Sequence, residues 1–171
     1  MAAIRVVQGD IAKQEADAIV NAANVGLFGG SGVSGAIFDA AGYDDMTEAC
    51  KKIGSCDYGD AVVTPAFKLH AKYVIHTVGP IYGQHNSHEP DILASCYIES
   101  LRRADELKLK TIVFPLISTG IYSYPKEEAA KIAIQSARDF LEDEPGTTLE
   151  EIVFCTFTPQ DKKLMDELLL W

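Results

Sequence analysis

The chain has 171 residues, of which 47% are apolar and 23% are charged, which is ordinary for one soluble domain built around one core. No apolar run reaches the roughly 18 residues of a membrane span, and no signal-peptide pattern is present. We therefore expect a single cytoplasmic domain over residues 1–171 without a membrane partner. The net charge of −10 argues against bulk nucleic-acid binding, which relies on clustered Lys and Arg.

Residues that bind metals are scattered along the chain. The two closest of the four cysteines lie six positions apart, which is not a zinc-site spacing, so we expect free thiols in a reducing compartment. His85, His88 and Glu89 have a superficially metal-like spacing. They lie in a polar loop with no further ligand nearby, so solvated side chains and no metal are expected.

The first predicted elements are two strands joined by a turn. Residues 4–8 (IRVVQ) contain β-branched apolar side chains and predict a strand. Asp10 follows as the N-cap of a short turn through residues 12–13, or alternatively as an acceptor for the exocyclic amine of a ligand. Residues 17–21 (DAIVN) predict a second, buried strand.

The stretch 21–37 (NAANVGLFGGSGVSGAI) leaves this second strand and crosses five glycines. Glycine lets the main chain come close to a ligand, and N–H groups at a helix N-terminus attract phosphate. A helix is predicted over residues 35–41, closed by Gly42. A plain connector remains the alternative interpretation, because the stretch matches neither G-x-G-x-x-G nor the P-loop.

The middle of the chain predicts further helices and strands. Residues 45–52 are expected to be helical, and residues 61–64 and 72–78 are expected to be strands. His76 lies within the second of these strands, where a hydrogen-bonded core histidine is favoured over a catalytic one. Apolar residues recur at helical intervals over residues 90–108, which predicts a long amphipathic helix.

A second loop of the same design follows. Residues 111–117 (TIVFPLI) are almost entirely apolar, as expected of a central strand covered on both faces. They run into 118–125 (STGIYSYP), and a helix is predicted over 126–142. Two such loops at one edge of a sheet can hold a pyrophosphate between them, where open α/β sheets usually bind ligands.

The remaining elements are a turn at 145–148, a last strand at 151–157 and a last helix at 161–170. Strands and helices alternate along the whole chain. This order predicts an α/β fold, a three-layer α/β/α sandwich with a mixed, largely parallel central sheet. We expect a monomer.

With both loops identified, the chain resembles the macrodomain family, and within it the MacroD-like branch. The matching segments follow the family's order and cover nearly the whole chain. They are GDI at 9–11, NAAN at 21–24, GGSGV at 29–33, GAI at 35–37, AAG at 40–42, YVIHTVGP at 73–80, ISTGIY at 117–122 and YP at 124–125.

The resemblance implies ADP-ribose, or an ADP-ribosylated protein, as partner and requires no cofactor. Asp10 would hold the adenine amino group, with Ile11 beside the ring. Phe157 would pack against the base, with simple core filling as the alternative, and Asn24 and Tyr122 would lie at the distal ribose. The implied ligand-binding residues are Asp10, Ile11, Asn21, Ala22, Asn24, Gly30, Ser31, Gly32, Val33, Ser34, Gly35, Ser118, Thr119, Gly120, Ile121, Tyr122 and Phe157.

MacroD-like proteins remove ADP-ribose from modified acidic side chains or deacetylate O-acetyl-ADP-ribose, which implies Asn24, Gly32 and Ser34 as catalytic positions here. Two residues depart from that branch: Ser34 stands where an aspartate is usual, and Phe38 where a histidine is usual. A serine hydroxyl can orient water but cannot take its proton near pH 7, and a positioned base typically supplies about 10²- to 10⁴-fold.

Two functions therefore stay open. The first is a hydrolase in which the ligand's own phosphate activates the water. The alternative is a non-catalytic reader of ADP-ribose. A Rossmann-type dinucleotide enzyme is disfavoured, because no G-x-G-x-x-G follows the first strand. Ser123 replaces a glycine that is usual in the second loop, which predicts a restricted backbone there.

Overall fold

The computed structural model describes residues 2–171 and contains one six-stranded sheet with the order β1-β6-β5-β2-β4-β3. All neighbouring strands are parallel except β3 and β4. This confirms the predicted mixed, largely parallel sheet. The strands are β1 (Ala3–Gln8), β2 (Ala18–Ala23), β3 (Ala61–Pro65), β4 (Tyr73–Val78), β5 (Thr111–Phe114) and β6 (Glu151–Thr156).

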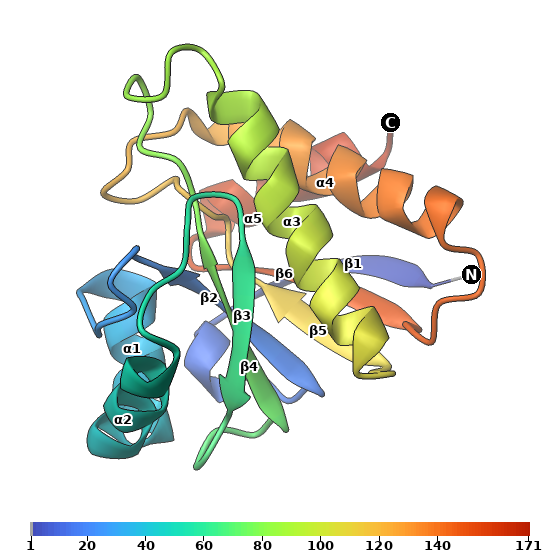
Figure 1. The fold of residues 1–171 in the computed structure, drawn as a ribbon. Coiled ribbons are helices and arrows are strands. Elements are labelled where there is room, and N and C mark those ends of the chain that lie inside the picture. Colours follow the sequence, from blue (N-terminus) through green and yellow to red (C-terminus); the bar gives the residue numbers. More distant parts are fainter. Residues whose placement is uncertain (1) are drawn as a thin grey trace.

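Helices cover both faces of the sheet, which completes the three-layer sandwich (Figure 1). On one face α1 packs against α2, and on the other α3 and α5 both contact α4. Within residues 2–171, no helix combines the length and apolarity that a membrane crossing requires. The helices are η1 (Ile11–Lys13), α1 (Gly32–Ala41), α2 (Tyr43–Ile53), α3 (Glu89–Glu106), α4 (Lys126–Asp143) and α5 (Pro159–Leu169).

Alternation along the strands divides the core into two clusters. In β2, Ala18 and Val20 face the layer of α3, α4 and α5, whereas Ile19 and Ala23 face the layer of α1 and α2. All four side chains are buried. β2 therefore has no solvent-facing side, as its uninterrupted apolar run predicts for a central parallel strand.

Several boundaries differ from the predicted ones for local reasons. α1 begins at Gly32 rather than at residue 35, because Gly32 takes up the positive φ of +61° that starts the turn. β5 ends at Phe114, since Pro115 has no N–H to continue the ladder. Pro65 is the last residue of β3, which is tolerated because β3 is an edge strand.

β2 and β5 are adjacent in the sheet, but the helices that follow them cover opposite faces. The chain after β2 enters α1 on one side, and the chain after β5 enters α4 on the other. The two outgoing loops must therefore separate at the carboxyl ends of these strands, and a crevice opens between them.

Candidate functional site

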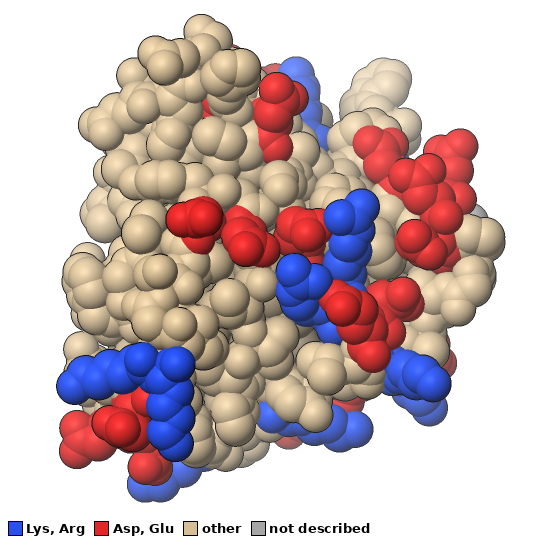
Figure 2. Space-filling model, viewed as in Figure 1, with Lys and Arg blue, Asp and Glu red and all other residues tan. Residues whose placement is uncertain are grey.

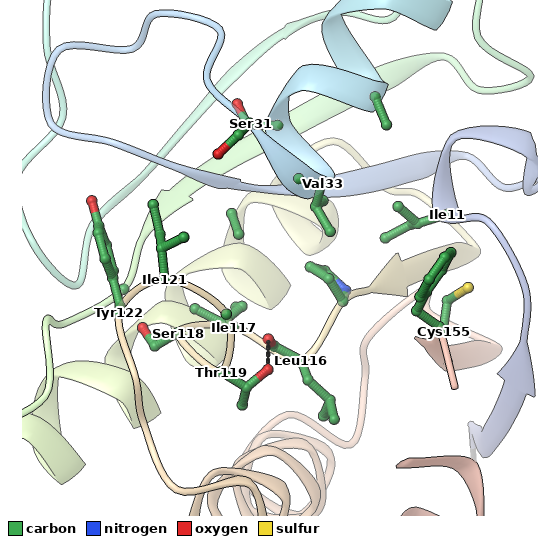
Figure 3. A pocket seen from close by; sticks show the side chains of 18 of the residues that line it. Ile11, Ser31, Val33, Leu116, Ile117, Ser118, Thr119, Ile121, Tyr122 and Cys155 are labelled. Atoms are coloured by element: carbon green, nitrogen blue, oxygen red, sulfur yellow. Dashed lines mark hydrogen bonds between the residues drawn. The ribbon is translucent and has the colours of Figure 1, made fainter. Parts of the chain in front are cut away.

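A cleft of about 540 Å³ lies at the carboxyl ends of the parallel strands. The segments that follow β1, β2, β4, β5 and β6 all contribute to its lining. Figure 3 shows Ser31 and Val33 of the first loop across the cleft from Ser118, Thr119 and Ile121 of the second. The two loops singled out in the sequence thus form the opposite walls of one cleft.

Most of the implied ligand residues meet here. The cleft is lined by Asp10, Ile11, Ala22, Asn24, Gly30, Ser31, Gly32, Val33, Ser34, Ser118, Thr119, Gly120, Ile121, Tyr122 and Phe157. Two others lie outside the lining. Asn21 is fully buried beneath Ser34, and Gly35 lies behind the loop, against the carbonyl oxygen of Gly30.

The first loop is held by the side chains of Asn24 and Tyr43, whose hydroxyl donates to the Gly29 carbonyl oxygen at 3.4 Å, and by close backbone packing. The Asn24 carboxamide donates to the Phe28 carbonyl oxygen at 2.9 Å and accepts from the Phe28 N–H at 3.1 Å. A Cβ at Gly35 would lie 2.4 Å from the Gly30 oxygen, and one at Gly29 would lie 2.5 Å from the Tyr43 hydroxyl. The close approach of loop and helix therefore depends on glycine at residue 35, where the contact is with backbone, whereas the Tyr43 side chain can move away from residue 29.

The N-terminus of α1 faces the cleft. Gly32, Val33 and Ser34 are the first residues of the helix, so their N–H groups have no partner inside it. Together with the helix dipole they favour a bound anion. The side chain of Ser34 is buried, and its Oγ lies 3.4 Å from Asn21 Nδ2.

The second loop has an unusual backbone. Ser118 and Ser123 both have positive φ values, +68° and +61°, a region that side-chain-bearing residues adopt at a cost of roughly 1–2 kcal/mol. Backbone hydrogen bonds fix both residues. Tyr124 N–H donates to the Ser118 carbonyl oxygen at 2.9 Å, and Ser123 N–H donates to the Gly120 carbonyl oxygen at 3.0 Å. Ser123 thus occupies the conformation that glycine would adopt more readily.

Close packing with β4 also positions this loop. A Cβ at Gly79 would lie 2.1 Å from Ser118 Oγ and 2.6 Å from Ile117 Cγ2. Thr119 Oγ1 donates to the Leu116 oxygen at 2.9 Å, the dashed contact in Figure 3. Contacts within the protein therefore position the wall of the cleft that residues 116–119 form.

One end of the cleft is suited to a flat base. Asp10 caps η1 by accepting from Ala12 N–H at 2.9 Å, which confirms the N-cap prediction. Within residues 2–171, no protein donor reaches its second carboxylate oxygen, so that oxygen is available as an acceptor. Ile11 is buried, whereas Phe157, which follows β6 directly, is 82% exposed. Phe157 therefore does not fill the core.

The opposite end is apolar and partly open. Ile121 is 83% exposed, and Tyr122 is half-buried beside it (Figure 3). Burial raises the pKa of Tyr122, and the neighbouring Tyr58 adds to that shift. Burial also raises the pKa of Cys155, at the base end, to about 11. Both groups therefore stay protonated near neutral pH.

Sequence reasoning missed part of the lining. Gly79 and Asp161 were not among the implied ligand-binding residues, because each reaches the cleft only through the packing of distant elements. Lys126 Nζ binds Asp161 Oδ1 at 3.1 Å. The lining residues that were not among the implied ligand-binding residues are Gly9, Ala23, Ala36, Gly79, Pro115, Leu116, Ile117, Cys155, Thr156 and Asp161.

In the described part of the chain, no basic side chain lines the cleft. Among the residues that the structure describes, the charged ones in its lining are Asp10 and Asp161. The chain has no Asp, Glu, Lys or Arg at residues 18–38, 73–88 or 111–125. Figure 2 shows this on the molecule: the upper left part, where Figure 1 places the loops after β4 and β5, is nearly free of charge. An anion in this cleft must therefore be held by backbone N–H groups and neutral hydroxyl donors such as those of the serines in its lining.

The polar loop after β4 closes on itself. His85 Nε2 accepts from Ile81 N–H at 3.0 Å, and Glu89 Oε2 accepts from His85 N–H at 3.0 Å. In the described part of the chain, no group of three or more His, Cys, Asp and Glu side chains is arranged to hold a metal ion. His85 and Glu89 are therefore loop-forming residues, and the prediction of solvated side chains is wrong for Glu89, which is buried.

Similarity to known proteins agrees with this geometry. The profile of the Macro domain family matches residues 20–133. A macro domain-containing protein of Chlorobaculum tepidum is 49% identical over 158 residues, which span 92% of this chain and 90% of the relative. Another from Listeria monocytogenes is 47% identical over 169 residues, 97% of this chain and 96% of the relative.

Solved structures are similar over the same length. The Oceanobacillus iheyensis macrodomain with ADP has a TM-score of 0.91 and 38% identity, covering 96% of this chain and 88% of its own. The Trypanosoma brucei macrodomain in complex with ADP-ribose has a TM-score of 0.89 and 37% identity, covering 97% and 68%. The residues that match the family profile include both loops of the cleft.

Proposed function

This chain belongs to the macrodomain family, and on that premise we propose that it binds ADP-ribose in the cleft between its two loops. One observation carries the proposal: two walls of backbone face each other, and none of the lining residues in the range 2–171 has a basic side chain. Such walls complement a diphosphate, whose oxygens accept hydrogen bonds from N–H groups. Similar structures that contain ADP or ADP-ribose support the same ligand.

The ends of the cleft suggest the orientation of the ligand. Adenine stacks on Phe157, which is exposed in the absence of ligand, and the free oxygen of Asp10 accepts from the adenine amino group. The diphosphate lies between the N-terminus of α1 and residues 118–122. The distal ribose then lies near Asn24 and Tyr122.

A second candidate function is hydrolysis of this ligand from modified acidic side chains, or deacetylation of O-acetyl-ADP-ribose. It is favoured by Asn24 and Ser34, two polar side chains in the lining near the N-terminus of α1. Neither is a base near neutral pH, so the phosphate of the ligand would have to take the proton of the attacking water. Asn24 and Ser34 would orient that water.

The reader function is favoured by the identity of residue 34. No carboxylate lies at this position. Ser34 Oγ lies 3.4 Å from Asn21 Nδ2, this nitrogen lies 3.1 Å from His76 Nδ1, and the titratable His76 ring is fully buried. A protein of this kind would bind an ADP-ribosylated protein and leave the modification intact.

Two measurements on one sample separate these functions. Calorimetric titration with ADP-ribose tests binding, and absence of binding heat would refute the proposal. Release of ADP-ribose from an auto-modified protein, measured against a no-enzyme blank, tests hydrolysis. Ser34→Asp is the matched variant: if the carboxylate is the one missing part, it should release ADP-ribose faster than the wild type by about 10²-fold or more.

A further inference from the structure

A row of polar side chains runs from the cleft into the core. Ser34 Oγ lies 3.4 Å from Asn21 Nδ2, and the same nitrogen lies 3.1 Å from His76 Nδ1. On the far side of the ring, His76 Nε2 lies 2.9 Å from Thr64 Oγ1. Asn21 and His76 are paired in register on β2 and β4, so the sheet itself aligns them. All four side chains are buried.

The hydrogens in this row can point in one of two directions. In the first, His76 carries its proton on Nε2 and donates to Thr64, whose hydroxyl donates to the Pro65 oxygen at 3.1 Å. His76 Nδ1 then accepts from the Asn21 amide, which also donates to Ser34. In the second, the His76 ring is protonated on Nδ1. The Asn21 amide is rotated by 180°, so that its oxygen takes the place of its nitrogen and accepts from both His76 and Ser34.

The count of unpaired groups decides between the two directions. The first leaves two groups without a protein partner: the Asn21 Oδ1 atom in the core, and the Ser34 hydroxyl hydrogen, which lies at the cleft. The second leaves the whole Asn21 NH₂ group without a partner in the position that Oδ1 occupies in the first. It also turns the Thr64 hydroxyl toward His76 Nε2, so that the Pro65 carbonyl oxygen loses this donor. Buried N–H groups without a partner are rarer than under-satisfied carbonyl oxygens, and each lost partner costs about 1 to 3 kcal/mol. The first direction is therefore the stable one.

The sulfur atoms nearby do not reverse this order. Cys50 Sγ lies 3.9 Å from His76 Nε2, and Met46 Sδ lies 3.4 Å from Thr64 Oγ1. Sulfur is a weak partner in either role, and burial raises the pKa of Cys50 to about 11, so its thiol is neutral. The Pro65 oxygen remains the better acceptor for the Thr64 hydroxyl.

Since Asn21 donates to Ser34, the Ser34 hydroxyl hydrogen has to point elsewhere. Within residues 2–171, the hydrogen bonds of Ser34 Oγ include no protein acceptor for it. We propose that Asn21, His76 and Thr64 are positioning residues that hold the Ser34 hydroxyl as a hydrogen-bond donor to an acceptor oxygen of the ligand. This inference rests on the proposed function, because the acceptor is supplied by ADP-ribose.

The consequence for the site is specific. An aspartate at position 34 would offer only acceptors to the ligand and to water, whereas the serine here offers a donor whose direction is set from the core. The arrangement binds oxygen-rich ligands and supplies no base. This arrangement therefore supports the reader function rather than hydrolysis.

The tautomer of His76 tests the row in the ligand-free wild-type protein. A long-range ¹H–¹⁵N spectrum at neutral pH should show the proton on Nε2 and an unprotonated Nδ1. A ring protonated on Nδ1 would overturn the inference, because Asn21 would then have to accept from both neighbours.

Calorimetry with ADP-ribose tests the donor. Ser34→Ala should weaken binding about tenfold, the worth of one hydrogen bond to an anionic ligand. Thr64→Val, which does not touch the cleft, should weaken binding by about two- to fivefold in the wild type and by nothing in the Ser34→Ala background. Thr64→Ser keeps the hydroxyl and should bind as the wild type does.

Two results would refute the coupling: wild-type affinity in a folded Thr64→Val protein, or the same fold-loss from Thr64→Val with and without Ser34. If ADP-ribose gives no heat with the wild type, the proposed function fails. The spectrum needs no ligand, so it still decides whether the row has the inferred direction.

Discussion

Gly35 is the position at which one methyl group should separate the stability of the first loop from its ability to bind. A Cβ there would lie 2.4 Å from the Gly30 carbonyl oxygen, whereas real Cβ contacts are essentially never closer than 3.0 Å. Gly35→Ala must therefore move the loop or the helix by roughly 0.6 Å or more, because closely packed backbone has no free space to take up the overlap.

Two opposing effects follow from Gly35→Ala. Alanine inside a helix is favoured over glycine by about 1 kcal/mol, which offsets part of the strain, so we expect a modest change in the free energy of unfolding. Binding has no such compensation, since the displaced N–H groups no longer face the diphosphate. Loss of one charge-assisted hydrogen bond is worth about 1.5 to 3 kcal/mol, or roughly 10- to 100-fold in the dissociation constant.

Calorimetry with ADP-ribose and urea denaturation of the ligand-free protein measure the two effects separately. Gly146→Ala is the matched control, because a Cβ at Gly146 meets nothing within 4 Å and lies in the turn before β6, away from the cleft. A folded Gly35→Ala protein that binds ADP-ribose with wild-type affinity would refute the view that the loop is held in place by this contact.

Three further changes test other parts of the account. Phe157→Ala should weaken ADP-ribose binding by about 1 to 3 kcal/mol, the worth of one stacked base; Trp171→Ala, which removes an exposed aromatic outside the cleft, should leave the calorimetric affinity unchanged. Gly79→Ala should lower both melting temperature and affinity, because its Cβ would overlap Ser118 Oγ at 2.1 Å; an unaltered thermal melt would contradict this packing. Burial lowers the pKa of His76 from 6.5 to about 4, so below pH 6.5 the unfolded chain takes up a proton that the folded chain refuses. Unfolding free energy should therefore fall by up to about 3 kcal/mol from pH 6.5 to 4, and urea titrations of His76→Gln should lack that part of the loss.

The sequence predicted the fold because each element carries its own local pattern. The apolar run of β2 and the helical spacing of α3 depend only on neighbouring residues, and both elements are present. The alternation of strands and helices then left few ways to arrange a parallel sheet. The two loops were predicted to lie at the same edge of the sheet because each follows a parallel strand, and both line one cleft.

The finer contacts of the site could not be predicted, because they join residues far apart in the chain. That Asn21 lies beside His76 follows from the register between β2 and β4, which composition does not encode. The contact of Gly79 with Ser118 likewise depends on how the loop after β5 folds back. The sequence also did not predict that the Asn24 carboxamide binds the backbone of Phe28 in its own loop.

The strain in the second loop bears on how a cleft without cations binds an anion. Ser118 and Ser123 hold conformations that cost roughly 1–2 kcal/mol each, and such conformations persist only where the surrounding structure over-determines them. Here Gly79 and the N–H group of Tyr124 supply that surrounding structure. These contacts lie within the protein, and a loop held by its own protein contacts costs a ligand less ordering entropy on binding. Fixed dipoles in a preorganised cleft can therefore replace the charge attraction that a chain of net charge −10 does not offer.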